Sequence, residues 1–261
     1  MAEKKIEAEI AIDATPEEVW RAISEGDRLK QWFPLDARIT PGKGGKVWMS
    51  WGEGAEWESP IEVWEPGKRM GTVDVMPGQE GAPPTRIAVD YIIESRGGQT
   101  ILRLVHSGFA DDTWQDELDS LDSGWASFLA NLKLYVERHR NDERTLAHFR
   151  HPVVEIARAD AFARVMKALG LASQKLAVGS RFSATTVDGD HFEGIVQVYR
   201  PPINFSAVAE NWNNAFLMVE IEPGKGRCRP AIWLSLYGSA AARAGEISQR
   251  IHDLLLREFR T

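Results

Sequence analysis

In the first half of the chain, hydrophobic and polar residues mostly alternate, which is typical of half-buried β-strands. The first such segment is Lys4 to Ile12. Turns rich in glycine and proline separate the later segments, and we expect strands over residues 46–51, 57–64, 69–75, 86–94 and 100–106. Because consecutive strands joined by short turns pair antiparallel, this half is predicted to contain an antiparallel meander.

A long helical pattern follows the meander, from about Trp114 to Asn141. Its apolar residues recur at three- and four-residue steps. This stripe contains Leu118, Leu121, Trp125, Phe128, Leu129, Leu132 and Val136. A stripe with two aromatic residues needs a large apolar partner, so we infer that the antiparallel sheet curves around this helix.

Two shorter helices are predicted between the first strand and the meander. Thr15 is suited to cap a helix, Pro16 fits its first position, and Glu18 completes a capping box. This helix is expected to end near Gly26, and a second short helix is expected over residues 28–33. Both precede the strands that face the long helix.

The strand alternation also predicts which side chains face the long helix, because successive side chains point to opposite faces of a strand. We assign to this face Val47, Met49, Trp51, Trp57, Ile61, Val63, Ile87, Val89, Tyr91, Leu102, Leu104 and His106. A histidine therefore ends the apolar stripe of the last strand.

The second half has a similar order of elements. A helix is predicted over residues 160–169, strands over 181–187, 191–199, 204–210, 215–221 and 227–237, and a final helix over 240–259. Residues 138–150 are predicted to be a helix end and a linker. We therefore expect two domains, 1–144 and 145–261, with the second repeating the first in a shortened form.

Several motifs of the first half occur together and in order: residues 14–20 (ATPEEVW), 29–33 (LKQWF), 62–66 (EVWEP), 106–109 (HSGF), 124–125 (GW) and 131–137 (NLKLYVE). With these motifs, residues 4 to 140 resemble the heat-shock protein 90 ATPase activator homologue-like domain. That family is part of the START-like, or SRPBCC, helix-grip superfamily. The resemblance implies an α+β fold in which an antiparallel sheet wraps a long C-terminal helix. It also implies a cavity for small apolar molecules between them.

The fold class predicted for the whole chain is therefore α+β. It consists of a helix-grip domain followed by a second, degenerate helix-grip-like domain, although the second half lacks the motifs of the family. The resemblance implies a cavity rather than a reaction, because function resides in sites and not in folds.

Composition and charge narrow the function classes. The net charge of −7, without a block of lysine or arginine, argues against a nucleic-acid partner. No apolar run reaches the roughly 20 residues that cross a bilayer, and the N-terminus lacks the apolar core of a secretory signal, so we expect no membrane partner and a cytoplasmic location. A single cysteine, Cys228, excludes an internal disulfide. The histidines lack metal-ligand spacing, and no metal or cofactor is expected.

Eight of the ten tryptophans lie before residue 126, so aromatic residues are concentrated in the first half. Our first hypothesis is that a small hydrophobic or aromatic molecule binds between the long helix and the sheet. The residues predicted to line this site are Trp51, Trp57, Tyr91, Leu104, His106, Trp125 and Phe128. Each also has a simpler interpretation as ordinary core, because in a helix-grip fold the core is also the lining of the pocket.

Two other hypotheses remain open. His106 as acid or base and Tyr91 as hydrogen-bond donor would suit an enzyme of cyclase or hydrolase type. The family resemblance implies a third function, a co-chaperone that stimulates the ATPase of a heat-shock protein 90 homologue. The sequence leaves homo-oligomerisation and a chaperone partner open, and no residue is assigned as catalytic or as a metal ligand.

Overall fold

A computed structural model describes residues 4–52, 54–76, 84–109, 115–224 and 226–260. The chain divides into two compact units, which are described separately. The first comprises the chain up to Leu118 together with Phe128–Arg140, and the second comprises Asp119–Ser127 and the chain from Asn141 onward. Each unit combines an antiparallel sheet with helices. The predicted α+β class is therefore confirmed for both halves.

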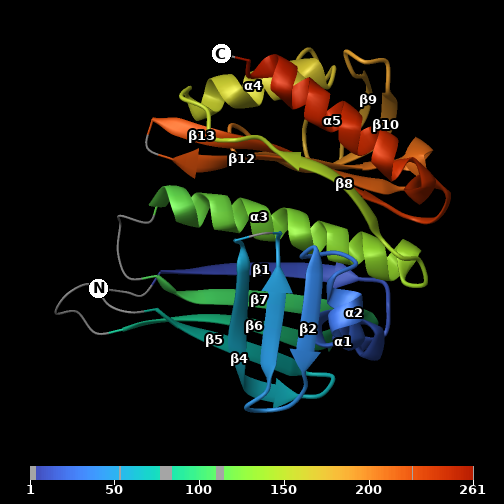
Figure 1. Cartoon of the computed structure of the whole chain (residues 1–261). Coiled ribbons are helices and arrows are strands. Elements are labelled where there is room, and N and C mark those ends of the chain that lie inside the picture. The colour runs from blue at the N-terminus through green and yellow to red at the C-terminus, as the bar shows by residue number, and fades with distance from the viewer. Residues whose placement is uncertain (1–3, 53, 77–83, 110–114, 225, 261) are drawn as a thin grey trace. The chain divides into compact units, whose positions relative to one another are not determined.

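The first unit is built on a seven-stranded antiparallel sheet with the order β1-β7-β6-β5-β4-β3-β2. Its elements are β1 (Lys4–Ile12), α1 (Pro16–Ser24), α2 (Gly26–Leu29), β2 (Asp36–Thr40), β3 (Lys46–Ser50), β4 (Glu56–Glu65), β5 (Arg69–Met76), β6 (Thr85–Arg96) and β7 (Gln99–Phe109), and α3 (Gln115–Leu134), which continues as a π-helical turn, Tyr135–His139. The sheet is strongly bent, and Figure 1 shows that β2 lies at a steep angle to β1 and β7. The sequence did not predict β2, and Trp114, its proposed start for the long helix, lies outside the described residues.

The predicted capping box starts α1. The Glu18 backbone N–H donates to Thr15 Oγ1 at 3.2 Å, and the Thr15 backbone N–H donates to Glu18 Oε2 at 2.9 Å. This exchange satisfies donors that would be unpaired at a helix start. The helix then buries Val19 and Ile23, and Trp32 Nε1 donates to the Ala22 carbonyl at 2.9 Å. These contacts fix α1 and α2 on the sheet.

One predicted orientation was wrong because β4 contains a β-bulge. Ile61 pairs with Thr72 and Val63 pairs with the next residue, Gly71, so the register shifts and Ile61 and Val63 lie on opposite faces. Val63 therefore does not share the face of Ile61, and Trp64 takes that face instead. Its ring lies 5.0 Å from the ring of Trp20 on α1. The bulge thus exchanges a valine for a tryptophan beneath the first helix.

The second unit contains a six-stranded sheet with the order β8-β13-β12-β11-β10-β9. Its elements are β8 (Thr145–Arg150), α4 (Arg158–Ala168), β9 (Arg181–Thr185), β10 (His191–Arg200), β11 (Asn204–Ala209), β12 (Ala215–Gly224), β13 (Arg227–Leu236) and α5 (Ala244–Glu258), with 3₁₀ turns at Glu210–Trp212 and Gly238–Arg243. The strand β8 corrects the sequence prediction, which placed these residues in a linker. It pairs antiparallel with β13, where Ala147 lies opposite Leu234.

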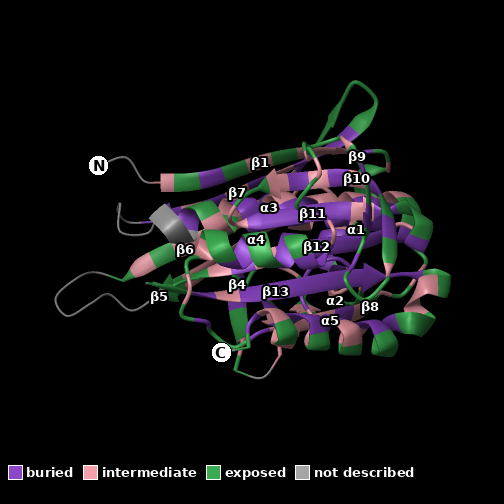
Figure 2. Ribbon diagram, turned by 90° about the horizontal axis from the view of Figure 1, so that it is seen from above, coloured by how far each residue is buried: buried purple, intermediate pink, exposed green. Residues whose placement is uncertain are grey.

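The core of the second unit is closely covered. Phe205, Val219 and Leu255 have no exposed surface, and they belong to one continuous cluster formed by the sheet, α4 and α5. Figure 2 shows β13 buried along most of its length. The core is formed by the two predicted helices, α4 and α5, and the predicted strands between them in sequence, because the apolar faces of these elements all contact one another.

The second unit also includes residues 119–127 of α3, which contact the other face of its sheet. Ser127 Oγ lies 2.9 Å from Asn204 Oδ1 and 3.1 Å from Ser206 Oγ, and both serines are fully buried. The Asn204 Nδ2 group is buried without a hydrogen-bond partner among the described residues. Asp122 forms an ion pair with Arg200. Small polar side chains thus join this part of the helix to β11.

Candidate functional site

The strand registers of the first unit define an inner face, which α1, α2 and the first unit's part of α3 cover. Residues that pair directly across antiparallel strands share a face. On β3 to β7 the inner face comprises Val47, Met49, Trp57, Ser59, Ile61, Trp64, Met70, Thr72, Asp74, Ile87, Val89, Tyr91, Ile93, Leu102, Leu104 and His106. The predicted site residues Trp57, Tyr91, Leu104 and His106 all lie on it.

One end of this face is closely packed. Tyr91 lies directly opposite Leu104 on one side and Met70 on the other. Tyr91 is 6% exposed, Met70 is 2% exposed, and Leu104 has no exposed surface. For Leu104 the structure therefore favours a core role, and Tyr91 stands at the border of this packed end.

The other end of the inner face stays open to solvent, and we call it the accessible end. Its strand residues are Met49, Trp57, Thr72, Asp74, Ile87 and Val89, and each keeps an intermediate or high exposure although it faces the helices. Trp57 is 42% exposed and pairs with Met49. An inward tryptophan that is not covered offers apolar surface to a ligand.

An aromatic cluster borders the accessible end. Trp51 directly follows β3, and its ring lies 5.5 Å from that of Phe128 on α3 and 5.3 Å from that of Phe33. Phe33 and Phe128 are themselves 4.7 Å apart in an edge-to-face arrangement. Trp51 and Phe128 remain partly exposed. The structure thus brings together Trp51 and Phe128, and adds Phe33, which the sequence did not single out as a site residue.

His106 lies at the border of the two ends. It pairs directly with Val89, so it is a diagonal neighbour of Tyr91 on the same face. His106 is 8% exposed, and burial lowers the pKa of its imidazole to about 4. Burial also raises the pKa of the Tyr91 hydroxyl. Both groups are therefore neutral at pH 7, and both can form hydrogen bonds.

Trp125 differs from the other predicted site residues. It is 7% exposed and lies in the segment of α3 that belongs to the second unit.

Sequence reasoning missed a carboxylate on the inner face. Asp74 on β5 pairs with Ile87, and its Oδ2 accepts a hydrogen bond from Ser59 Oγ at 2.9 Å. Ser59 is only 3% exposed, whereas Asp74 is partly exposed. Counting by two from Met70 would have placed Asp74 inward, but the sequence provided no inward anchor for this strand.

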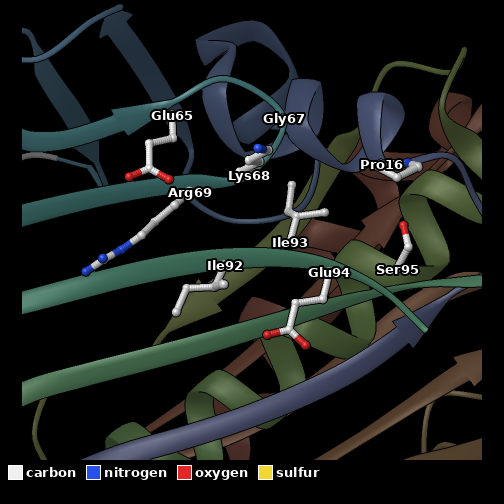
Figure 3. Close-up of a pocket in the computed structure, with 9 residues that line it drawn as sticks. All are labelled: Pro16, Glu65, Gly67, Lys68, Arg69, Ile92, Ile93, Glu94 and Ser95. Atoms are coloured by element: carbon white, nitrogen blue, oxygen red, sulfur yellow. The ribbon is translucent and has the colours of Figure 1, made fainter.

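A separate hollow lies at the ends of β4 to β6, with a volume of about 400 Å³. Figure 3 shows its lining, which includes Glu65, Lys68, Arg69 and Glu94. Arg69 is held by Asp90, with a nitrogen–oxygen distance of 2.7 Å. None of the predicted site residues lines this hollow. Its charges of both signs do not match an apolar ligand, so it is distinct from the accessible end.

The described part of the chain lacks two features, a metal-binding cluster and a membrane-spanning helix. It contains no group of three or more His, Cys, Asp or Glu side chains placed to hold a metal ion. Among its helices, none has the length and apolarity of a membrane span.

Comparisons with known proteins add to this geometry. Residues 13–137 match the family model described as "Activator of Hsp90 ATPase homolog 1-like protein". No match was found among curated proteins. The matched segment includes the capping box of α1, strands β2 to β7 of the sheet and the long helix, whereas β1 precedes it.

Similar solved structures include protein MLL2253 from Mesorhizobium loti, with 23% identity over 52% of this chain and 98% of that one and a TM-score of 0.46. The Aha1 dimer from Colwellia psychrerythraea has 25% identity over 53% and 99%, with a TM-score of 0.44. The di-domain ARO/CYC BexL from the BE-7585A biosynthetic pathway has 16% identity over 99% of both chains, with a TM-score of 0.44. None of these similarities is evidence for a ligand or a reaction. The family match confirms the resemblance seen in the motifs: residues 13–137 are similar to the activator of Hsp90 ATPase homolog 1-like domain.

Proposed function

We propose that the first domain binds a small apolar or aromatic molecule at the accessible end of its inner face. The supporting observation is the aromatic cluster of Trp51, Phe33 and Phe128, whose rings lie within 5.5 Å of one another while Trp51 and Phe128 stay partly exposed. Aromatic surface left uncovered on an inward face gains free energy when a planar ligand covers it. Trp57 extends this surface along β4.

The protonation states favour binding over proton transfer. An imidazole with a pKa of about 4 is protonated in only about one molecule in a thousand at pH 7. His106 is therefore a poor general acid near neutrality, and a base of such low pKa accepts a proton weakly. Tyr91 keeps its proton, so its hydroxyl can form hydrogen bonds with a ligand but does not act as a base. The pair suits contact with a ligand carbonyl or hydroxyl better than a cyclase or hydrolase reaction.

Titration with Prodan, a neutral aromatic ketone whose emission shifts to the blue in apolar surroundings, tests this proposal. We expect saturable binding that Trp51→Ala weakens about tenfold, because a covered aromatic side chain contributes about 1.5–3 kcal/mol. Trp48→Ala is the matched control. Trp48 lies on the opposite face of β3, and the Arg38 guanidinium lies 4.4 Å from its ring. Absence of saturable binding, or equal weakening by both substitutions, would contradict the proposal.

The family match supports a second candidate, stimulation of the ATPase of a heat-shock protein 90 homologue. The test is an ATPase assay of such a homologue with and without this protein at saturating concentration. A rise in turnover would support this function, and unchanged turnover would exclude it. Trp51→Ala in the same assay separates the two candidates, because only ligand binding depends on the accessible end.

A further inference from the structure

The inner face of the first unit carries an uneven distribution of charge. On β3 to β7, Asp74 is the only carboxylate among the inner-face residues that the structure describes, and neither lysine nor arginine occurs there. The charged residues of these strands otherwise lie on the outer face. Examples are the ion pairs of Arg86 with Glu62 and of Arg69 with Asp90. Within β3 to β7, a single inward carboxylate therefore occurs without an inward lysine or arginine.

The carboxylate is held in a defined position. Ser59 donates its hydroxyl proton to Asp74 Oδ2 at 2.9 Å across β4 and β5. The Asp74 Oδ1 atom has no hydrogen-bond partner among the described residues. A carboxylate oxygen accepts more than one hydrogen bond, so this oxygen retains its capacity to accept from a ligand. One oxygen positions the group and the other is left for recognition.

The neighbours of Asp74 place it within the accessible end. It lies opposite Ile87, and Thr72 and Val89 form the next pair along the same two strands. All four residues are partly exposed. A ligand that covers the apolar side chains here also removes water from the carboxylate. Removal of water strengthens an interaction with a donor or a positive charge and makes contact with an anion unfavourable.

From this arrangement we infer that Asp74 selects the ligand of the first domain: an aromatic or apolar molecule that carries a hydrogen-bond donor, with a cationic amine preferred and a carboxylate rejected. This inference rests on the proposed ligand-binding function and specifies the ligand class. The aromatic cluster supplies affinity for the ring, and Asp74 supplies selectivity for the polar group. His106 and Tyr91, both neutral at pH 7, do not oppose an amine.

Three matched probes test this inference by titration calorimetry at pH 7: 1-naphthalenemethylamine, 1-naphthalenemethanol and 1-naphthoate. They share one ring system and differ in the charge of the polar group. We expect the amine to bind about tenfold more tightly than the alcohol, because a charge-assisted hydrogen bond is stronger than a neutral one. The carboxylate is expected to bind most weakly.

Substitutions assign the preference to Asp74. Asp74→Asn removes the charge but can still accept from Ser59, and it should abolish the tenfold preference for the amine while changing the affinity for the alcohol less than twofold. Asp74→Glu keeps the charge and should retain part of the preference. Glu58→Gln is the control, because Glu58 lies on the outer face of β4 and pairs with Lys46. It should leave the order of the three probes unchanged.

The outcomes separate this inference from the proposed function. If the amine and the alcohol bind equally and Trp51→Ala weakens both, the site is supported and the role of Asp74 is overturned. The same conclusion follows if the carboxylate binds best, or if Asp74→Asn leaves the preference for the amine intact. If none of the three probes binds, both proposals are overturned.

Discussion

The inner face of the first sheet and the core-facing side of the second sheet have the same strand alternation, but they cover their side chains to different extents. In the second unit, Phe205 and Val219 have no exposed surface. In the first, Thr72 and Val89 keep partial exposure although they are flanked by the buried Tyr91. Similar strand alternation can therefore give a filled core or an accessible face.

Burial keeps one titrating group of opposite type neutral in each unit. His106 in the first unit has a pKa lowered to about 4 by burial. Glu220 in the second unit has a pKa raised to about 7 by burial, with a further contribution from Glu222. Each group is kept neutral, because burial disfavours the charged form of either type. Protonation of His106 in acid and ionisation of Glu220 in alkali should therefore each lower stability.

The largest expected effect comes from paired truncations of phenylalanine. Phe205→Ala should lower the free energy of unfolding by about 3–5 kcal/mol, because it leaves a cavity in a fully covered core. Phe128→Ala should lower the free energy of unfolding by clearly less, because the Phe128 side chain is partly exposed and its removal leaves a smaller buried cavity. Chemical denaturation of both variants measures the difference. Equal losses would refute the contrast between a filled and an accessible interior.

A smaller effect is expected from the pH dependence of His106. Its pKa is about 4 in the folded chain and about 6.5 for a solvent-exposed imidazole, so between these values the unfolded chain binds the extra proton. Stability is unaffected above pH 6.5 and falls as the pH decreases towards 4, by roughly 2 kcal/mol at pH 5. Between pH 7 and pH 5, the His106→Gln variant should therefore lose about 2 kcal/mol less stability than the parent protein. Denaturation curves at the two pH values test this, and an unchanged pH dependence would contradict it.

The smallest effect is expected at Glu220 and has the opposite sign. Its pKa is raised from the ordinary 4.5, so the stability that the neutral carboxyl contributes below pH 4.5 is lost as the pH rises through about 7. Glu220→Gln should therefore be more stable than the parent at pH 8, by about 1 kcal/mol because partial exposure screens the charge, and equal at pH 4. As a control, Glu222→Gln should lower stability at pH 8, because Glu222 accepts two hydrogen bonds of 2.8 Å from Arg150. Destabilisation by both substitutions would overturn the role of burial at Glu220.

Most elements of the fold could be predicted from local pattern. The alternation of Lys4–Ile12 and the capping box at Thr15 act within a few residues, and both occur as expected. The strand β8 was missed because the segment 145–150 is short and includes a charged residue. It forms a strand only through its pairing with β13. The face of Val63 was wrong because a bulge shifts the register without a clear signal in the sequence.

The candidate site shows the same division. Trp51 and Phe128 could be predicted from their aromatic character and their period, and the structure brings their rings together. Asp74 was overlooked because a single charged residue in an alternating strand is ordinarily assigned to solvent. The pairing of Asp74 with Ile87 and its hydrogen bond from Ser59 decide its direction.

The α+β class, the family resemblance of residues 13–137 and the capped start of α1 could all be inferred from the sequence alone, because they follow from periodicity and from motifs of neighbouring residues. Only the tertiary structure decided that Leu104 is sealed in core, that Trp57 remains exposed and that Asp74 faces inward. The physical reason is that exposure and direction depend on strand register and on side chains distant in the chain. No local pattern of residues contains that information.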